Sequence, residues 1–460
     1  MQDPRRIPPT LRMKYDVRGP RYTSYPAATH FHPTPVPDLF DRWASRNSLA
    51  DDPGLSLYLH IPFCRARCTF CGCHSVVPGD GDTVERYVGA LVEEMRLASR
   101  RVNPRRPVVQ VALGGGTPNF LSEDQIDRLL SAVERTWAVS PGAECSVEID
   151  PRTANPGKLD VFLRHGFNRF SLGVQDFDPR VLSTVRRGQD LMQVEEVVAH
   201  LRSRGCSAVN FDLVYGLPGQ DLSSAAATAR QVVRLAPSRI ALYSYAHVPW
   251  IHPAQKSLEK RGLPDQDAKL ALFLAMLDIF QDAGYLSVGM DHFALPGDSL
   301  ARALEDRSLR RNFMGYTTGR GTDLLAFGAS AISSIGSSYS QNAKDLDAYM
   351  TGIAGGSLPV ERGFLLERED EIRRELIMDL FCNFAADLAA LGKRFGFDAT
   401  SAFSEEMSRL QSMADDGLLS LTPESIVVSE TGRFFIRAIC MVFDRYLSTH
   451  DSAPVYSRTV

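Results

Sequence analysis

Four cysteines lie close together in the run Cys64-Arg-Ala-Arg-Cys68-Thr-Phe-Cys71-Gly-Cys73. The spacing of the first three, C-x3-C-x2-C, can gather three thiolates around one iron–sulfur cluster while the fourth iron keeps no protein ligand. An open iron is a position where a substrate or a cofactor can coordinate. The run therefore predicts a reactive centre rather than a structural staple.

A zinc site is the alternative for the same cysteines. Structural zinc normally requires a closed tetrahedral set of ligands, and the second ligand pair of such a set is missing here. The pattern therefore favours an iron–sulfur cluster. The outlying cysteines lie among apolar residues and are expected to fill the core: Cys145, Cys206, Cys382 and Cys440.

The composition indicates an ordinary soluble globular protein. Hydrophobic residues make up 44% of the 460, and the formal net charge is −4. The basic residues are spread along the chain, which argues against a nucleic-acid partner. The N-terminus lacks the apolar core of a secretory signal, and no apolar run is long enough to span a bilayer. We therefore expect a cytoplasmic monomer with no membrane span that acts on a small molecule.

The elements that carry the cysteine run are predicted to be alternating strands and helices. The pattern predicts six β/α units, with strands at residues 55–60, 108–113, 146–149, 169–173, 208–213 and 239–243. Strands that alternate with crossover helices form a parallel sheet. Catalytic groups are then expected at the C-terminal ends of the strands, where the cysteine run lies.

Two helix starts carry capping-box patterns. Asp82-x-x-Glu85 predicts the start of a helix around residues 84–99, and Ser122-x-x-Gln125 predicts the start of the next helix. A candidate domain boundary lies in the Gly-rich stretch 326–356. We expect three segments, which are an N-terminal segment contacting the active site, a barrel with its extension and a mainly helical C-terminal domain, at residues 1–54, 55–355 and 356–460.

The C-terminal domain is expected to contain three helices and a short two-strand element. The helices are predicted near residues 369–384, 400–416 and 431–447, and the strands at 418–428. This order resembles a small winged-helix-like domain, but no basic patch supports DNA binding. A lid that covers the substrate is the favoured role.

Several segments resemble radical S-adenosylmethionine (SAM) enzymes, and most closely the oxygen-independent coproporphyrinogen III dehydrogenases, also called oxidases. Within the expected barrel they are Tyr58-Leu-His-Ile-Pro-Phe-Cys64, Gly114-Gly-Gly-Thr-Pro118, Val147-Glu-Ile-Asp-Pro151, Leu172-Gly-Val-Gln-Asp-Phe177 and Asp212-Leu-Val-Tyr-Gly-Leu-Pro218. Outside it they are Gly19-Pro-Arg-Tyr-Thr-Ser-Tyr-Pro26, Met290-Asp-His-Phe-Ala294, Gly315-Tyr-Thr-Thr318 and Tyr456-Ser-Arg458. The likeness covers nearly the whole chain. It implies an α/β fold, a partial (β/α)6 TIM-like radical SAM barrel with a mainly helical C-terminal domain.

The resemblance also implies the cofactors. Cys64, Cys68 and Cys71 would ligate a [4Fe–4S] cluster whose fourth iron chelates SAM, whereas Cys73 would not be a ligand. The family pattern places two SAM molecules in the site. The implied catalytic residues are Tyr58, Glu148 and Phe313. The implied contacts to the first SAM are Tyr58, Gly115, Gly116, Thr117 and Ile332, and those to the second are Gln175, Arg187, Asp212 and Ala246. Glu148 is implied as a further cofactor contact.

Two groups of residues near the predicted site, the glycines after the second strand and the two carboxylates, also have ordinary structural explanations. Gly114 to Gly116 follow a predicted strand, where glycines let the backbone approach a ligand, but glycine clusters also form plain turns. Glu148 and Asp212 lie near predicted strand ends, where a carboxylate can bind ribose hydroxyls or an ammonium group, or can simply be solvated. The position at the mouth of a barrel favours the functional interpretation.

The implied reaction converts coproporphyrinogen III to protoporphyrinogen IX. A hydrogen atom is removed from the β-carbon of a propionate, and carbon dioxide and an electron are then lost to leave a vinyl group, at two propionates in turn. The implied partners are this tetrapyrrole and an unidentified electron donor. Arginine forks suit the carboxylates of such a substrate best, and the candidates are Arg21, Arg310 and Arg311.

The chain also departs from the family pattern. Met314 replaces a glutamine, which removes a hydrogen-bond donor and acceptor, and Arg186 and Gly188 stand where the neighbours of Arg187 are usually Asn and Glu. These changes affect the second SAM site and the substrate contacts rather than the cluster. Two alternatives follow, a divergent radical SAM methyltransferase acting on a tetrapyrrole and a haem-trafficking protein. Cys73 and the Arg-Tyr-Thr-Ser-Tyr-Pro segment argue against the second.

Overall fold

The computed structural model describes residues 7–47, 52–319, 321–447 and 456–458. The chain forms two compact units. The larger unit contains His32–Ala283 and Gly321–Leu365, and the smaller unit contains Met1–Phe31, Gly284–Arg320 and Leu366–Val460. These units group the chain differently from the three expected segments, because Gly284–Arg320 clusters with the C-terminal region. Whether the N-terminal segment contacts the active site stays a prediction.

The larger unit is built on six parallel strands that neighbour one another in chain order. They are β1 (Leu55–Ile61), β2 (Val108–Gly115), β3 (Val139–Ile149), β4 (Arg169–Gln175), β5 (Val209–Tyr215) and β6 (Arg239–Ser244). The six β/α units expected from the sequence are thus confirmed, although β3 begins seven residues earlier than expected. Parallel strands in chain order with a helix between each pair give a partial (β/α)6 barrel.

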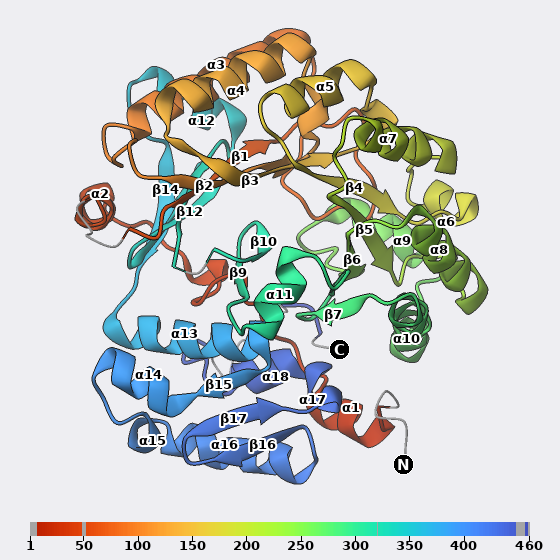
Figure 1. The fold of residues 1–460 in the computed structure, drawn as a ribbon, viewed down its shortest axis with the longest axis vertical. Helices are drawn as coiled ribbons and strands as arrows, with labels where there is room; N and C mark the ends of the chain where they lie inside the picture. The colour runs from red at the N-terminus through yellow and green to blue at the C-terminus, as the bar shows by residue number, and fades with distance from the viewer. Residues whose placement is uncertain (1–6, 48–51, 320, 448–455, 459–460) are drawn as a thin grey trace. The chain divides into compact units, whose positions relative to one another are not determined.

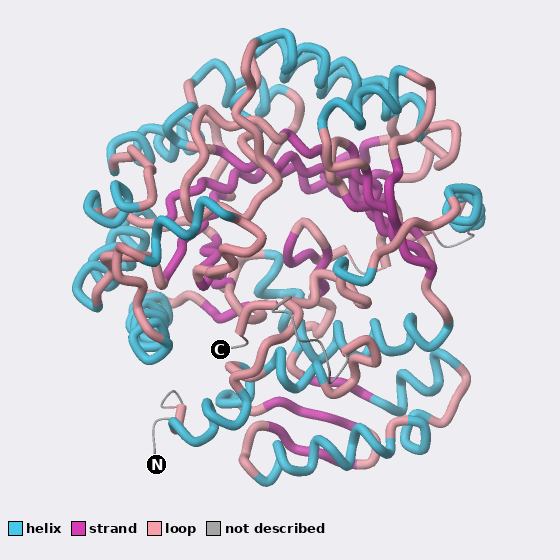
Figure 2. The backbone as a smooth tube through the Cα atoms, turned by 180° about the vertical axis from the view of Figure 1, so that it is seen from behind, coloured by secondary structure: helices cyan, strands magenta, loops and turns pink. Residues whose placement is uncertain are grey.

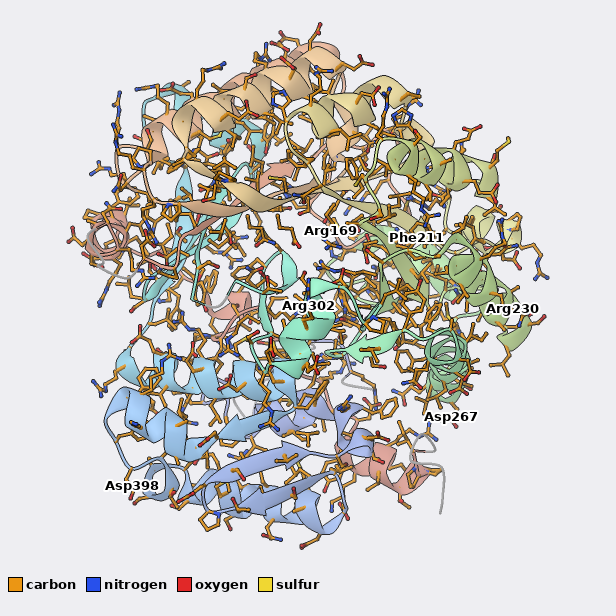
Figure 3. All side chains as sticks on the ribbon, viewed as in Figure 1. Arg169, Phe211, Arg230, Asp267, Arg302 and Asp398 are labelled. Atoms are coloured by element: carbon orange, nitrogen blue, oxygen red, sulfur yellow. The ribbon has the colours of Figure 1, made fainter. Side chains whose placement is uncertain are left out.

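Helices cover the outer face of this sheet, as the ribbon and the view from behind both show (Figures 1 and 2). They are α3 (Gly81–Ala98), α4 (Glu123–Thr136), α5 (Pro156–Arg164), α6 (Pro179–Thr184), α7 (Leu191–Ser203) and α8 (Leu222–Leu235). Phe211 on β5 is fully buried, whereas Arg230 on α8 is exposed on the outside of the barrel (Figure 3). The strands thus carry buried side chains, and the helices expose the side chains that point away from the sheet.

Strand β1 shows how the sheet presents side chains to the site. Its residues Leu55, Leu57, Leu59 and Ile61 are fully buried and lie on one face. Because successive side chains point to opposite faces of a strand, Tyr58 and His60 lie on the other face, toward the inside of the barrel. The cysteine run follows directly at the C-terminal end of β1.

Four further strands extend the sheet beyond β1. The Gly-rich stretch 326–356 contributes to them, and the compact unit continues to Leu365. Strand β11 (Asp323–Phe327) is parallel to β1, and antiparallel pairing then follows through β12 (Ile332–Ile335), β13 (Ser338–Asn342) and β14 (Val360–Leu365). The remaining helices of this unit are α2 (Val36–Ser45), α9 (Lys256–Glu259), α10 (Gln266–Asp282) and α12 (Leu346–Ala354), with 3-10 turns at Pro118–Phe120, Pro151–Thr153 and Pro253–Gln255.

One of the two predicted capping boxes is present. The Ser122 side chain accepts a hydrogen bond from the Gln125 backbone, and the Gln125 side chain accepts one from the Ser122 backbone. The box predicted at Asp82 is wrong, because α3 begins at Gly81 and the cap is Asp80, which accepts from the Thr83 backbone at 2.9 Å. Asp82 instead lies in the first turn, where its carboxylate pairs with Arg86 at 3.1 Å.

The smaller unit is mainly helical around a small sheet. Its sheet has three strands rather than the two expected, because β15 (Ala385–Asp387) pairs with β17 (Ser425–Val428), which also pairs with β16 (Leu419–Thr422). The single helix predicted at 431–447 is wrong, since the chain there forms two short helices separated at Phe434 and Phe435. Its helices are α1 (Pro9–Tyr15), α11 (Ser299–Glu305), α13 (Arg368–Asn383), α14 (Leu388–Phe395), α15 (Ala399–Ala402), α16 (Ser404–Asp415), α17 (Glu430–Arg433) and α18 (Ile436–Met441), with a 3-10 turn at Ala28–His30.

Two short hairpins complete the smaller unit. They are β7 (Leu286–Val288) with β8 (His292–Ala294), and β9 (Arg310–Asn312) with β10 (Gly315–Thr317). In neither unit does the described chain contain a helix long and apolar enough to cross a membrane.

Candidate active site

The cysteines lie on a loop that begins after β1 and is closed on itself. The Cys64 backbone N–H donates to the Val76 carbonyl at 3.0 Å, and the Val76 N–H donates to the Pro62 carbonyl at 2.7 Å. Within this loop, the Cys71 N–H donates to the Cys68 carbonyl at 3.2 Å. We call residues 62–76 the cluster loop. Its backbone bonds hold the three predicted ligands on one short segment at the C-terminal end of a barrel strand.

Positive groups and hydrogen-bond donors surround the thiols. The guanidinium groups of Arg187 and Arg152 lie 3.7 and 3.9 Å from Cys68 Sγ. Hydrogen bonds from the Cys73 side chain and backbone lower the pKa of Cys71 to about 6, against the effect of burial. The pKa of Cys64 is raised, first by burial and then by the charges of the other thiolates. Because iron binds the thiolate form, the surroundings of Cys71 and Cys68 suit a metal cluster.

The spacing of the cysteines on the cluster loop suits an iron–sulfur cluster. A [4Fe–4S] cluster binds each thiolate to a different iron, and three thiolates leave the fourth iron open. Cys64, Cys68 and Cys71 on this loop can supply those three thiolates. Among the described residues, no group of three or more His, Cys, Asp or Glu side chains is arranged to hold a single metal ion.

The glycine turn after β2 is closely packed. An added Cβ would lie 2.5 Å from the His60 ring at Gly115, 2.6 Å from the Pro62 carbonyl oxygen at Gly116 and 2.9 Å from the Glu148 carboxylate at Gly114. Gly115 also has a φ of +114°, which side chains rarely adopt. A plain turn would explain a glycine at position 115 alone. At Gly114 and Gly116 there is also no room for a Cβ, because the backbone passes close to β1, β3 and the cluster loop.

Glu148 joins this turn to the end of β3. The Gly115 backbone N–H donates to Glu148 Oε2 at 3.0 Å. Burial, and then the negative charge of Asp212, raise the pKa of Glu148 to about 7. The carboxyl group can therefore hold or release a proton near neutral pH.

Tyr58 belongs to a hydrogen-bonded chain inside the barrel. Its hydroxyl lies 3.1 Å from His60 Nδ1, and His60 Nε2 lies 3.0 Å from the His74 carbonyl oxygen. Burial lowers the pKa of His60 to about 4, so the imidazole is neutral. A carbonyl oxygen only accepts, so Nε2 carries the proton and Nδ1 accepts from Tyr58. These hydrogen bonds connect Tyr58, through His60, to the cluster loop.

The residues predicted for a second SAM form another group, at the ends of β4 and β5. An added Cβ on Gly173 would lie 2.9 Å from Gln175 Nε2 and 3.3 Å from Arg187 Nη2, so these two side chains converge. Arg187 also donates to the Gly173 carbonyl and to Gln189, and lies 3.5 Å from an Asp150 oxygen. The structure thus brings Gln175 and Arg187 together.

Asp212 is held beside the same group. Ser171 Oγ donates to its carboxylate at 2.7 Å, and Asn210 Nδ2 donates at 2.9 Å. Its effect on the pKa of Glu148 places its carboxylate within electrostatic reach of the first group. Ala246 lies in the half-buried loop after β6, and Ile332 begins β12 opposite Gln341.

Known proteins match this chain over nearly its whole length. Residues 58–232 match the Radical SAM superfamily, and residues 366–435 match the HemN C-terminal domain. A protein named oxygen-independent coproporphyrinogen III oxidase from Bradyrhizobium diazoefficiens is 39% identical over 445 residues, which cover 97% of this chain and 98% of that protein. The proteins of the same name from Pseudomonas aeruginosa and Escherichia coli are 40% and 39% identical, covering 95% and 98% of this chain and the same shares of those proteins.

The chain belongs to the oxygen-independent coproporphyrinogen III oxidase family. The solved structure of the Escherichia coli coproporphyrinogen III oxidase, described as a radical SAM enzyme, is similar with a TM-score of 0.88 at 38% identity. That match covers 93% of this chain and 98% of the other. Members of the radical SAM superfamily use a [4Fe–4S] cluster and SAM, and the closed loop of thiols and the glycine turn fit these two groups.

The predicted catalytic residue Phe313 and the candidate arginines for the substrate carboxylates all lie in the smaller unit. The Phe313 ring meets Phe31 edge to face at 6.4 Å. Arg310 is buried and donates to Asp379 at 2.7 Å, with Glu375 at 3.6 Å. Arg310 thus has carboxylate partners of its own. The role of Phe313 stays a prediction.

Arg311 has a different environment in the same unit. Its guanidinium lies 4.8 Å from the ring centre of Tyr316 and 3.7 Å from an Asp291 oxygen. Burial opposes ionisation of Asp291, but the charge of Arg311 and a hydrogen bond from His292 outweigh it and lower its pKa. Arg21 adds to that positive field. Whether Arg21 or Arg311 anchors a substrate stays a prediction.

One group that supports the site was missed from the sequence. Glu94, buried on α3, accepts hydrogen bonds from the Gly328 backbone at 2.8 Å, Asn342 at 2.6 Å and Tyr349 at 2.6 Å. Nearby, the Tyr87 hydroxyl donates to the His60 carbonyl at 2.9 Å and accepts from the Ala329 N–H at 3.0 Å. The sequence contained one indication of this group, since Glu94 lies on the otherwise apolar face of α3.

Proposed function

We propose that this protein converts coproporphyrinogen III to protoporphyrinogen IX without oxygen, by oxidative decarboxylation of two propionate side chains to vinyl groups. The observation that carries this proposal is the 39–40% identity to family members over 95–98% of the chain. The cluster loop at the C-terminal end of β1 supports it, since barrel enzymes place their chemistry at that end.

Cys64, Cys68 and Cys71 are proposed to hold the [4Fe–4S] cluster. When bound, the cluster and SAM supply a 5′-deoxyadenosyl radical, which removes a hydrogen atom from the β-carbon of a propionate. The substrate would then lose carbon dioxide and pass one electron to a separate one-electron acceptor, which leaves the vinyl group. The guanidinium groups of Arg187 and Arg152 lie within 4 Å of the Cys68 sulfur, where they would offset the negative charge of a bound cluster.

The first SAM is proposed to lie against the glycine turn. The backbone of Gly115, Gly116 and Thr117 can approach a ligand there because no side chain intervenes at the two glycines. Glu148 Oε2 accepts a hydrogen bond from the Gly115 N–H. With a pKa of about 7, the carboxyl group can bind hydroxyl groups in either protonation state and an ammonium group when it is ionised. Tyr58 is oriented by His60, and Ile332 is proposed to close the other side.

A second SAM is proposed beside Gln175, Arg187, Asp212 and Ala246. The convergence of Gln175 and Arg187 and the orientation of Asp212 by Ser171 and Asn210 support this assignment. Phe313 is proposed as a third catalytic residue with Tyr58 and Glu148, and Met314 beside it lies in the turn between β9 and β10, where its N–H donates to Asn312 at 2.8 Å. We also propose a cytoplasmic monomer that receives electrons from a separate donor.

The decisive test is a product assay. Anaerobically reconstituted protein, SAM, dithionite and coproporphyrinogen III are expected to yield protoporphyrinogen IX with about two 5′-deoxyadenosines per product, because each propionate requires one hydrogen abstraction. The Cys64→Ser variant should yield neither. Abundant deoxyadenosine beside unchanged coproporphyrinogen would overturn the substrate, and a methylated tetrapyrrole would indicate the methyltransferase alternative. Haem binding by a cluster-loaded protein that forms no deoxyadenosine would indicate a trafficking protein.

A further inference from the structure

We propose that the surface around the cluster loop is the docking site for an acidic one-electron carrier protein. The inference rests on the proposed function, which consumes one electron for each SAM molecule cleaved. Two features define the surface. The basic rim consists of Arg65, Arg67 and Lys344, and the Trp250 turn consists of residues 248–252.

The basic rim carries positive charges that no described carboxylate neutralises. Arg65 and Arg67 lie between the predicted ligands Cys64 and Cys68, and both side chains are exposed. Lys344 is exposed as well, and its backbone accepts a hydrogen bond from His74 of the cluster loop. Among the described residues, no carboxylate forms an ion pair with any of the three. Such charges create a field that attracts an acidic partner.

The Trp250 turn is fastened to the cluster loop. Gln255 accepts from the Val248 N–H at 2.7 Å and donates to the Phe70 carbonyl at 3.0 Å. An added Cβ on Gly72 would lie 3.5 Å from His252 Nε2. Burial and the nearby charge of Arg67 lower the pKa of His252, so the turn also lies close to the rim. The turn and the basic rim therefore form one surface.

Apolar side chains are exposed on this surface. Trp250 is 46% exposed, Ile251 is 55% exposed, and Val77, directly after the cluster loop, is 52% exposed. In the described part of the larger unit, the other exposed large hydrophobic residues are only Met192 and Leu222. Aromatic and aliphatic anchors beside charged groups are typical of protein interfaces, and electron-transfer complexes need only a small one.

The position and the positive charge of this surface indicate which kind of protein binds there. A carrier that approaches here comes close to the cysteines that hold the cluster, whereas a carrier on the outer helices would be separated from them by the sheet. In each encounter the reduced carrier loses one electron and the cluster gains it, and no proton or covalent bond is exchanged. An acidic carrier complements the basic rim, and complementary charges chiefly raise the association rate.

The test measures reduction of the cluster directly. Reconstituted protein is mixed anaerobically with reduced flavodoxin, an acidic carrier used as the probe, and bleaching of the cluster absorbance is followed by stopped flow at several salt concentrations. We expect the double variant Arg65→Glu, Arg67→Glu to be reduced about tenfold or more slowly, with a flatter salt dependence. Dithionite should reduce both proteins at the same rate, since a small reductant needs no docking.

A charge-matched control is available on the outer helices of the barrel. Arg135 in the last turn of α4 and Arg230 on α8 are both exposed, and the double variant Arg135→Glu, Arg230→Glu changes the net charge equally. This control should retain the wild-type rate with flavodoxin. The Trp250→Ser variant should slow reduction without changing the salt slope, and it serves as the second variant if the arginine variant binds less iron. Calorimetry with oxidised flavodoxin should show weaker binding to both rim and turn variants.

Two outcomes would overturn the proposal. Equal rates of reduction by flavodoxin for wild type, the arginine variant and Trp250→Ser would exclude docking on this surface. A raised KM for coproporphyrinogen with dithionite as reductant would assign the basic rim to the substrate instead. Failure of the proposed function is distinguishable, because every protein reduced with dithionite would then form either no deoxyadenosine or deoxyadenosine beside unchanged coproporphyrinogen, whatever its rate of reduction by flavodoxin.

Discussion

The glycine turn after β2 and the polar group at the ends of β4 and β5 are shaped by different kinds of contact. At Gly115 and Gly116 an added Cβ would lie within 2.6 Å of His60 or of the Pro62 carbonyl. At the second group, Arg187 and Asp212 are instead held by hydrogen bonds from or to other side chains. Gly115 and Gly116 have no room for a side chain, whereas Arg187 and Asp212 are held by hydrogen bonds that single substitutions can remove one at a time.

Two of the departures from the expected family pattern lie beside the second group. Arg186 and Gly188 flank Arg187, and both are exposed. An added Cβ at Gly188 would meet no atom within 4 Å. Substitution at Gly188 therefore costs little packing, whereas a side chain at Gly115 or Gly116 would meet ring or backbone atoms.

The largest effect is expected from Gly115→Ala. Alanine would need a φ of +114° and would place its Cβ 2.5 Å from the His60 ring, so we expect a loss of about 2–5 kcal/mol in the free energy of unfolding. Deoxyadenosine formation should fall at least 100-fold, because the turn and Tyr58 both depend on the position of His60. Urea unfolding and the deoxyadenosine assay measure the two effects.

Gly188→Ala is the matched control in the second region. Its φ is not positive and its surroundings are open, so its free energy of unfolding should stay within about 0.5 kcal/mol of the wild type. If both variants lost similar stability, or if neither did, the contrast between the two regions would be wrong.

A smaller effect is expected from the pH dependence of Glu148. Its pKa in the folded protein is about 7, above the ordinary value of 4.5, so the folded state binds a proton that the unfolded state has released. The free energy of unfolding should therefore decline as pH rises from about 4.5 to 7. Glu148→Gln lacks this term, so its stability relative to wild type should rise across that window by up to about 3 kcal/mol.

Urea unfolding of the cluster-free proteins between pH 4.5 and 8 measures this difference. Glu94, whose pKa is also raised to about 7 by burial, is present in both proteins and cancels in the comparison. In an Asp212→Asn background the pH dependence should shrink, because the charge of Asp212 is the second cause of the shift. Parallel stability curves for wild type and Glu148→Gln would show that the carboxyl titrates normally.

The sequence predicted the local features and missed those that depend on distant contacts. The six strands, the Ser122 cap and the cluster loop follow from short-range patterns, and the structure contains all three. Asp80 and Asp82 both precede α3, and the pattern selected the wrong one because either carboxylate can cap a helix. The partners of Glu94 lie 234 to 255 residues further along the chain, so no local pattern reveals them. Strand β15 was missed for a similar reason, since a three-residue strand is defined by its pairing with β17.

The smallest effect is expected at Arg186, and it tests whether the second region is free to change. Arg186 has a φ of +57°, a left-handed conformation that costs most side chains about 1–2 kcal/mol and that asparagine adopts more readily. Arg186→Asn should therefore raise the free energy of unfolding by about 0.5–1 kcal/mol. Arg105, an exposed loop residue without a positive φ, supplies the control, and Arg105→Asn should leave stability unchanged. A loss of stability in Arg186→Asn would mean that the Arg186 side chain makes a contribution of its own, and the second region would then be as constrained as the glycine turn.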